Sequence, residues 1–206
     1  LKESLVHHTF EATDRHGKHL FTRLDNDRWL RLHFGMSGGL SYFKSMDEDP
    51  QYDRLLISFT NGYHLAYTSQ RKLGKITLLD DKAAFIERHD LGPDVLSDAM
   101  DLARFQGLLA DRRGMIKSAL MDQHLMSGIG NVYSDEILFQ AGIHPRAKVA
   151  DLDEEQIIQI YQKMCEVLQT AIEHQADPAQ FPASYLTPHR EEGEACPRCG
   201  GEVARV

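Results

Sequence analysis

The spacing of apolar residues changes near residue 95, and this change limits what the chain can fold into more than any other feature. Between Leu5 and about Leu79, apolar and polar residues alternate in short runs separated by glycine and by Asp/Asn turns. Such alternation with a period of two predicts antiparallel strands. The runs are HLFTRL (19–24), RWLRLHF (28–34), LLISF (55–59), YHLAYT (63–68) and KITLL (75–79).

After HDLGPDVLSD (89–98), apolar residues recur every three or four positions, which is typical of helices. Asp151, Asp153 and Glu154 make a suitable start for the last helix, which should continue to about His174. Cys165 shares an apolar face of that helix and is expected to be a buried core thiol. The helical runs are 100–111, 114–126, 131–142 and 153–175.

Composition is that of an ordinary globular protein. The 206 residues are 42% hydrophobic and 26% charged, which suits one or two domains with real cores. No apolar run could cross a bilayer, no leader opens the chain, and three cysteines make no disulfide framework, so we expect an intracellular, cytoplasmic protein. The net charge of -8 argues against indiscriminate polyanion binding but leaves room for a local basic patch.

A glycine turn, Ser127-Gly128-Ile129-Gly130-Asn131, interrupts the helical pattern and is followed at once by another helix. Glycine at both positions permits positive φ and leaves backbone N–H groups uncovered, and Asn131 is a candidate N-cap. Such a turn can hold a phosphate at the positive end of the helix dipole. From the glycine spacing alone, a tight corner between two helices is the favoured alternative.

Four segments together resemble a known family. They are RHGKHLFTRLDNDRWLRLHFGMSGGL (15–40), YTSQRKLG (67–74), LMDQHLMSGIGNVYSDEILFQAGIHP (120–145) and Cys196-Pro-Arg-Cys199. In this order they are similar to the motifs of the formamidopyrimidine-DNA glycosylase and endonuclease VIII family. The resemblance covers essentially the whole chain.

The resemblance implies an α+β protein for base-excision DNA repair. It predicts an incomplete, strand-rich, β-sandwich-like domain (1–90), a helical DNA-binding domain with a helix–two-turns–helix element (91–185) and a partial zinc hairpin (186–206). The implied activity is that of a bifunctional DNA glycosylase and abasic-site lyase. The expected partner is double-stranded DNA containing oxidised or abasic nucleotides, bound by a monomer that needs no redox cofactor or nucleotide.

The family's site residues carry over position by position. Lys18 matches a lysine that contacts phosphate and assists strand cleavage, although alone it could be a solvated charge. Asn131, with Gly128 and Gly130, matches the phosphate-binding turn, a role compatible with helix capping. Glu136 matches a carboxylate under the active site, or it could be a structural partner.

Three further positions match the trio that fills the duplex when a nucleotide is turned out: Met36, Arg71 and Leu73. Flipping costs stacking, so an apolar or planar plug is needed. Leu73 replaces a phenylalanine of the formamidopyrimidine branch and could equally be a buried strand leucine. Arg112 and Arg113 lie where the family contacts phosphates, with a solvated pair as the equal alternative.

Other family features are not found in the sequence. The chain begins LKESLVHHTF, whereas the family begins with a Pro-Glu segment whose proline amine attacks the sugar. Without it, the chain is expected to bind abasic DNA but not to be trapped by borohydride. Cys196 and Cys199 supply two of the four ligands of a structural zinc, or are free thiols. The segment 176–194 lacks the family's glycine-rich loop, so the preference between oxidised purines and pyrimidines stays open. A non-catalytic DNA-binding module is the alternative function.

Overall fold

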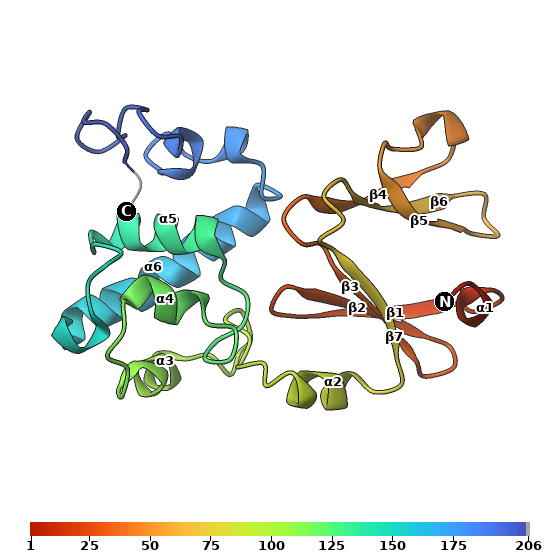
Figure 1. Cartoon of the computed structure of the whole chain (residues 1–206), viewed down its shortest axis with the longest axis horizontal. Helices are drawn as coiled ribbons and strands as arrows, with labels where there is room; N and C mark the ends of the chain where they lie inside the picture. Colours follow the sequence, from red (N-terminus) through yellow and green to blue (C-terminus); the bar gives the residue numbers. More distant parts are fainter. Residues whose placement is uncertain (205–206) are drawn as a thin grey trace. The chain divides into compact units, whose positions relative to one another are not determined.

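A computed structural model describes residues 1–204, which form two compact units. The strand unit is Leu1–His89, and the helical unit begins at Asp90 (Figure 1). Among the helices that the structure describes, none combines the length and the apolar content that a membrane crossing requires. The change of apolar spacing in the sequence lies close to the boundary between the two units.

The strand unit consists of two antiparallel sheets. One has the order β1-β2-β3-β7 and the other β4-β6-β5, so the strands of the two sheets interleave along the chain. All five predicted strand runs are confirmed. The elements are α1 (Lys2–Leu5), β1 (Phe10–His16), β2 (His19–Leu24), β3 (Trp29–His33), β4 (Gly38–Phe43), η1 (Met46–Glu48), β5 (Asp53–Ser58), β6 (His64–Ser69), β7 (Lys75–Leu79) and α2 (Lys82–Arg88).

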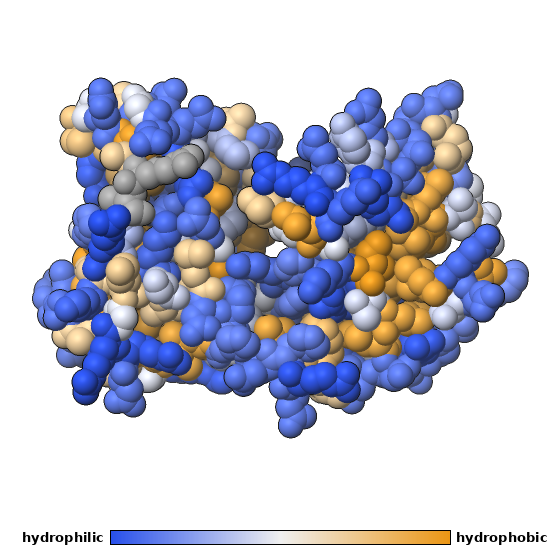
Figure 2. Space-filling model, in the orientation of Figure 1, coloured by the Kyte–Doolittle hydropathy of each residue, from blue (hydrophilic) through white to orange (hydrophobic). Residues whose placement is uncertain are grey.

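The facing sides of these two sheets form a small apolar core. Leu30, Leu32 and Tyr67 are buried there, and neighbours such as Leu55 and Ile57 are only partly buried. A cavity of about 160 Å³ opens beside them with almost wholly apolar walls. Apolar side chains gather on the visible surface of the strand unit accordingly (Figure 2). The core of this unit is therefore open on one side.

The outer side of the first sheet packs against α2. Phe85 of α2 contacts Phe21, with ring centroids 5.9 Å apart, and the Arg31 guanidinium lies 4.6 Å from the centre of the Phe85 ring. The N-cap of α2 is Asp81, whose side chain accepts hydrogen bonds from two backbone amides. The charged side chain of Arg31 is thus buried between the first sheet and α2.

The helical unit builds one continuous core from all of its α-helices. Its longest helix, α6, begins with a capping box in which Asp153 and Gln156 satisfy each other's backbone amides, and it ends at the predicted place with His174 as C-cap. Its elements are α3 (Leu102–Leu109), α4 (Ile116–Met121), α5 (Asn131–Ala141), η2 (Val149–Asp151), α6 (Glu154–Glu173), η3 (Pro178–Gln180) and η4 (Thr187–His189).

Two local predictions in this unit are wrong. Cys165 is exposed, because the buried stripe of α6 passes through Ile160, Met164 and Val167 and leaves Cys165 beside it. The helix predicted over 114–126 is confined to α4, which ends at Met121. The residues after it fold into turns. There the side chain of Gln123 donates a hydrogen bond to the carbonyl oxygen of Met121, the last residue of α4.

Candidate nucleic-acid interface

The predicted phosphate-binding turn connects α4 to α5. Gly128 has φ 128°, a backbone conformation that favours glycine, and Ile129 between the glycines is fully buried. Gly130 is the N-cap of α5, so Asn131 is the first helical residue and not the N-cap that the sequence predicted. No side chain caps this helix. The amides of its first turn therefore lack intrahelical acceptors and can meet an anion.

Gln123 holds this turn in shape. Its Nε2 donates to the carbonyl oxygens of Met121 at 2.7 Å and Ile129 at 2.9 Å. Its Oε1 accepts from the Gly128 amide at 3.1 Å. One side chain thus joins the end of α4 to both residues before Gly130. No local pattern in the sequence predicts this role of Gln123, although the residue belongs to the segment that resembles the family.

The segment before α3 supports the same turn through the backbone. The Ser127 amide donates to the Pro93 carbonyl at 2.8 Å, and the Val95 amide donates to the Ser127 carbonyl at 3.0 Å. A Cβ on Gly92 would lie 2.6 Å from the backbone of Leu125, so this close approach requires glycine. The turn is therefore fixed from two sides, while the Asn131 side chain stays exposed.

Arg112 and Arg113 lie on the loop between α3 and α4, and both are exposed. Arg112 approaches Asp122 at 4.0 Å, the limit for an ion pair. Exposed pairs of this kind contribute little to stability. Both guanidinium groups can therefore reach a ligand with little loss to the fold. Whether they contact phosphate stays a prediction.

Glu136 lies inside the helical unit and is 1% exposed. Its carboxylate accepts hydrogen bonds from the amides of Leu186 at 3.0 Å and Thr187 at 2.7 Å. The Thr187 hydroxyl donates at 2.6 Å and Gln140 at 2.8 Å. These contacts tie the segment after α6 to α5 and support the structural alternative. The catalytic role of Glu136 stays a prediction.

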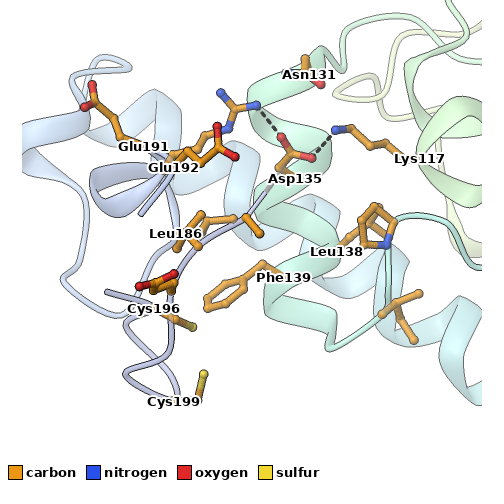
Figure 3. A pocket seen from close by; sticks show the side chains of 16 residues that line it. Lys117, Asn131, Asp135, Leu138, Phe139, Leu186, Glu191, Glu192, Cys196 and Cys199 are labelled. Carbon is orange, nitrogen blue, oxygen red and sulfur yellow. Dashed lines mark hydrogen bonds and ion pairs between the residues drawn. The ribbon is translucent and has the colours of Figure 1, made fainter. Parts of the chain in front are cut away.

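An open cavity of about 930 Å³ lies between α5 and the C-terminal segment (Figure 3). Asp135 projects from α5 between two cations: Lys117 Nζ lies 2.5 Å from its carboxylate, and Arg190 pairs with the other oxygen. Asn131 also lines this cavity, one turn earlier on the helix. Asp135 thus partly neutralises the charges of Lys117 and Arg190, which lie near the start of α5.

Lys18 occupies the tight turn between β1 and β2, after Gly17, whose φ is 57°. The side chain is exposed overall, but burial of part of it lowers the pKa of the ammonium group. His33 is close enough to Lys18, Arg31 and Lys75 for their charges to lower its pKa further, after desolvation. Lys18 is thus one of several cationic groups at this end of the first sheet.

The three predicted wedge residues lie on the two loops that cross between the sheets. Met36 is 74% exposed, and Arg71 Nη1 lies 3.8 Å from its sulfur atom. Leu73 is 52% exposed, so the buried-strand alternative is wrong for this residue. The structure therefore brings all three predicted residues to one exposed place. Insertion into DNA stays a prediction.

Cys196 and Cys199 lie in a tight turn closed by the Cys196 amide, which donates to the Gly201 carbonyl at 2.7 Å. Hydrogen bonds from the amides of Arg198 and Cys199 lower the pKa of the Cys196 thiol. A structural zinc needs four ligands. Within residues 1–204, no three His, Cys, Asp or Glu side chains gather to hold a metal. The two cysteines alone do not fit a complete zinc site.

Comparisons with known proteins match both units to domains of the same enzyme family. Residues 1–76 match the formamidopyrimidine-DNA glycosylase N-terminal domain, and residues 91–182 match the formamidopyrimidine-DNA glycosylase H2TH domain. The formamidopyrimidine-DNA glycosylase of Moorella thermoacetica is 33% identical, over 94% of this chain and 75% of its own length. The Arabidopsis thaliana protein of that name is 32% identical, and the chain spans only 52% of it.

Solved structures agree with these sequence matches. The Lactococcus lactis enzyme in complex with DNA containing FAPY-dG superposes with a TM-score of 0.86 at 27% identity, over 100% of this chain and 79% of that one. Its complex with DNA containing an abasic site has the same TM-score at 28% identity. The α+β fold expected from the sequence is confirmed by these matches.

Proposed function

The chain belongs to the formamidopyrimidine-DNA glycosylase family of base-excision repair, and we propose that it binds duplex DNA at an oxidised or abasic nucleotide. The observation that carries this proposal is the turn between α4 and α5, with Gly128 at φ 128°, uncapped amides on α5 and an exposed Asn131. Such a site binds a phosphate without reading sequence. Affinity should therefore be similar for different flanking sequences.

The wedge residues supply the other half of the proposed binding mode. When a nucleotide leaves the stack, the gap must be filled, and Met36 and Leu73 present exposed apolar atoms for that purpose. Arg71 adds a planar cation beside them. The preference for damaged over intact DNA would come from this loop pair, whereas the phosphate turn would contribute equally to both.

For the chemistry, we propose base removal followed by elimination at the abasic sugar, with Lys18 as a phosphate contact and an aid to elimination. An imine requires an amine that is nucleophilic at neutral pH, and most lysine is protonated there. Burial lowers the pKa of Lys18, while the side chain as a whole stays exposed to water. The expectation that residues 1–206 bind abasic DNA without covalent trapping therefore rests on Lys18 not acting as the nucleophile.

The test uses two variants of the full chain. Affinity for duplexes with and without a tetrahydrofuran abasic analogue is measured for the wild type, Asn131→Ala and the control Gln162→Ala, an exposed amide on α6. Asn131→Ala should weaken both affinities about three- to tenfold, the equivalent of one hydrogen bond. The control should bind like the wild type. A wild type with no preference for the abasic duplex would contradict the proposal.

Borohydride trapping on a duplex with a natural abasic site is measured for residues 1–206 and for the same residues preceded by a Pro-Glu N-terminal segment. Trapping by the extended chain supports the enzyme, and its absence from both proteins supports the non-catalytic module. Binding without trapping is the expected result for residues 1–206. Trapping that disappears in Lys18→Ala would make Lys18 the nucleophile and overturn the assignment of roles. Trapping that persists in Lys18→Ala would place the nucleophile on another amine of the chain.

A further inference from the structure

The two wedge loops run side by side because strand register fixes both ends of each. Residues 34–37 connect β3 to β4, and residues 70–74 connect β6 to β7. His33 pairs with Lys75 in one sheet, and Gly38 pairs with Ser69 in the other. The start of the first loop therefore lies beside the end of the second, and the end of the first lies beside the start of the second.

Glycines allow these two loops to touch backbone to backbone. Gly35 has φ +65°, and a Cβ on it would lie 2.8 Å from the carbonyl carbon of Leu73. A Cβ on Gly74 would lie 1.7 Å from the Tyr67 hydroxyl oxygen and 2.9 Å from the His33 carbonyl oxygen. Neither position has room for a side chain. The space at Gly74 is therefore taken by the end of the Tyr67 side chain, whose hydroxyl makes the shortest contact, and by the His33 carbonyl oxygen.

That hydroxyl belongs to Tyr67, which is 3% exposed. It donates a hydrogen bond of 2.8 Å to the carbonyl oxygen of His33, the last residue of β3. The Tyr67 ring stacks on Phe34, the first residue of the Met36 loop, with centroids 5.6 Å apart. Burial raises the pKa of Tyr67, so the hydroxyl keeps its proton and remains a donor at neutral pH. Tyr67 thus contacts both loops at their base.

We propose that Tyr67 is a positioning residue that joins the two loops into one rigid wedge. The inference rests on the proposed function, because it assumes that Met36, Arg71 and Leu73 enter the duplex together. Exposed tips have few contacts of their own, so their order must come from the base of the loops. A site held in its bound shape beforehand loses less entropy on binding.

The first test is Tyr67→Phe, which removes one oxygen atom and keeps the ring. The preference for abasic over intact duplex should fall roughly three- to tenfold, the equivalent of one net hydrogen bond. The fluorescence change of 2-aminopurine opposite the abasic analogue, which reports insertion, should fall with it. Affinity for intact duplex should not change. The control is Tyr63→Phe, which removes the same atom from a half-buried tyrosine that stacks on Tyr42 and lies outside both loops.

The second test is a double-mutant cycle with Gly74→Ala. The added Cβ would collide with the Tyr67 hydroxyl oxygen, so Gly74→Ala alone should reduce the preference for the abasic duplex at least as much as Tyr67→Phe. In the Tyr67→Phe background the shortest contact is gone, while the contacts of 2.9 Å with the ring carbon Cζ and the His33 carbonyl oxygen remain. Gly74→Ala should therefore reduce the preference further, but by less than in the wild type. Independent, additive losses would show that the hydroxyl does not join the loops.

A third measurement needs no DNA. In protein labelled at methionine methyl groups, Tyr67→Phe should increase the mobility of the Met36 methyl, assigned through Met36→Leu, while Tyr63→Phe leaves it unchanged. An unchanged Met36 signal in Tyr67→Phe overturns the proposal, as does equal weakening of damaged and intact DNA binding. A wild type without preference for abasic DNA overturns the proposed function instead, and the methyl signal still decides whether Tyr67 joins the loops.

Discussion

The two units bury polar side chains in opposite ways. In the helical unit, Glu136 accepts four hydrogen bonds and Gln123 makes three, so these side chains act as internal braces. In the strand unit, Arg31 is 5% exposed, yet among residues 1–204 its one side-chain hydrogen bond is a 3.4 Å contact to Thr77, and its Nε finds no partner there. His19 beside it also has a buried Nδ1 that no described residue bonds.

This difference separates polar groups that stabilise from polar groups that cost stability. A buried acceptor that is fully bonded leaves several donors unsatisfied when it is removed, whereas a poorly bonded buried cation leaves little behind. The cluster around Arg31 contains His19, His33 and His89, and desolvation lowers the pKa of Arg31. Within residues 1–204 no carboxylate pairs with this guanidinium. Four substitutions test the comparison.

The largest effect is expected for Glu136→Ala. It removes the acceptor for the Leu186 and Thr187 amides and should lower the free energy of unfolding of the helical unit by about 3–5 kcal/mol. Urea unfolding followed by circular dichroism measures it. Glu173→Ala, on the exposed side of α6, is the control and should change little. If Glu136 acts only in catalysis, the two variants will unfold alike.

Gln123→Ala should have the next largest effect. Three hydrogen bonds in the turn before α5 are lost, which should cost about 2–3 kcal/mol and weaken binding to all duplexes, because the turn proposed to bind phosphate loosens. Unfolding and DNA affinity are measured on the same preparation. The matched control is Gln159→Ala on the surface of α6. Unchanged DNA affinity would show that the hydrogen bonds of Gln123 stabilise the fold without affecting DNA binding.

Arg31→Leu should have a smaller effect of the opposite sign. Replacing a buried, poorly bonded cation by an apolar side chain should raise the free energy of unfolding of the strand unit by about 1 kcal/mol. The gain is limited because the contact with the Phe85 ring is lost. Arg23→Leu, at an exposed ion pair, should change stability by less than about 0.5 kcal/mol. A loss of stability in Arg31→Leu would mean that Arg31 is a brace like Glu136.

At neutral pH the smallest effect is expected at His19, because its contribution to stability changes only below pH 6.5. Desolvation, with the nearby charges of Arg31, His33, His89 and His16, lowers its pKa from 6.5 to about 4. Below pH 6.5 His19 becomes protonated in the unfolded chain, whereas in the folded chain it stays neutral until about pH 4. The contribution of His19 to the free energy of unfolding should therefore fall as the pH falls from 6.5 to about 4 and stay constant below that pH. His33, whose pKa is also lowered, acts in the same direction.

His19→Phe checks this prediction. The variant keeps an aromatic ring beside Phe21 and Phe85 but has nothing to protonate. Urea unfolding at several pH values between 6.5 and 4 should show the wild type losing stability relative to the variant as the pH falls. A constant difference between the two proteins would show that His19 is solvated well enough to titrate normally.

Much of the fold and the site follows from local sequence. Apolar spacing predicted five of the seven described strands, the helices α3 to α6 and the start and end of α6, because period and capping chemistry act within a few residues. It missed β1, β4 and α2. The glycine turn and the wedge positions followed from resemblance, and the structure brings Met36 and Arg71 within 3.8 Å. Where local reasoning failed, the errors were of position. Asn131 stands one place inside its helix, Cys165 lies one position away from the buried stripe, and the helix predicted over 114–126 ends at Met121.

The contacts between distant residues were decided only by the tertiary structure. Glu136 meets Thr187 across 51 positions, and Tyr67 meets His33 across 34, so no local pattern could predict either bond. The sequence by itself determined the family, the class of most elements and the place of the glycine turn between α4 and α5. Packing decided which polar groups became braces, because a buried donor or acceptor gains only when a partner from elsewhere in the chain reaches it.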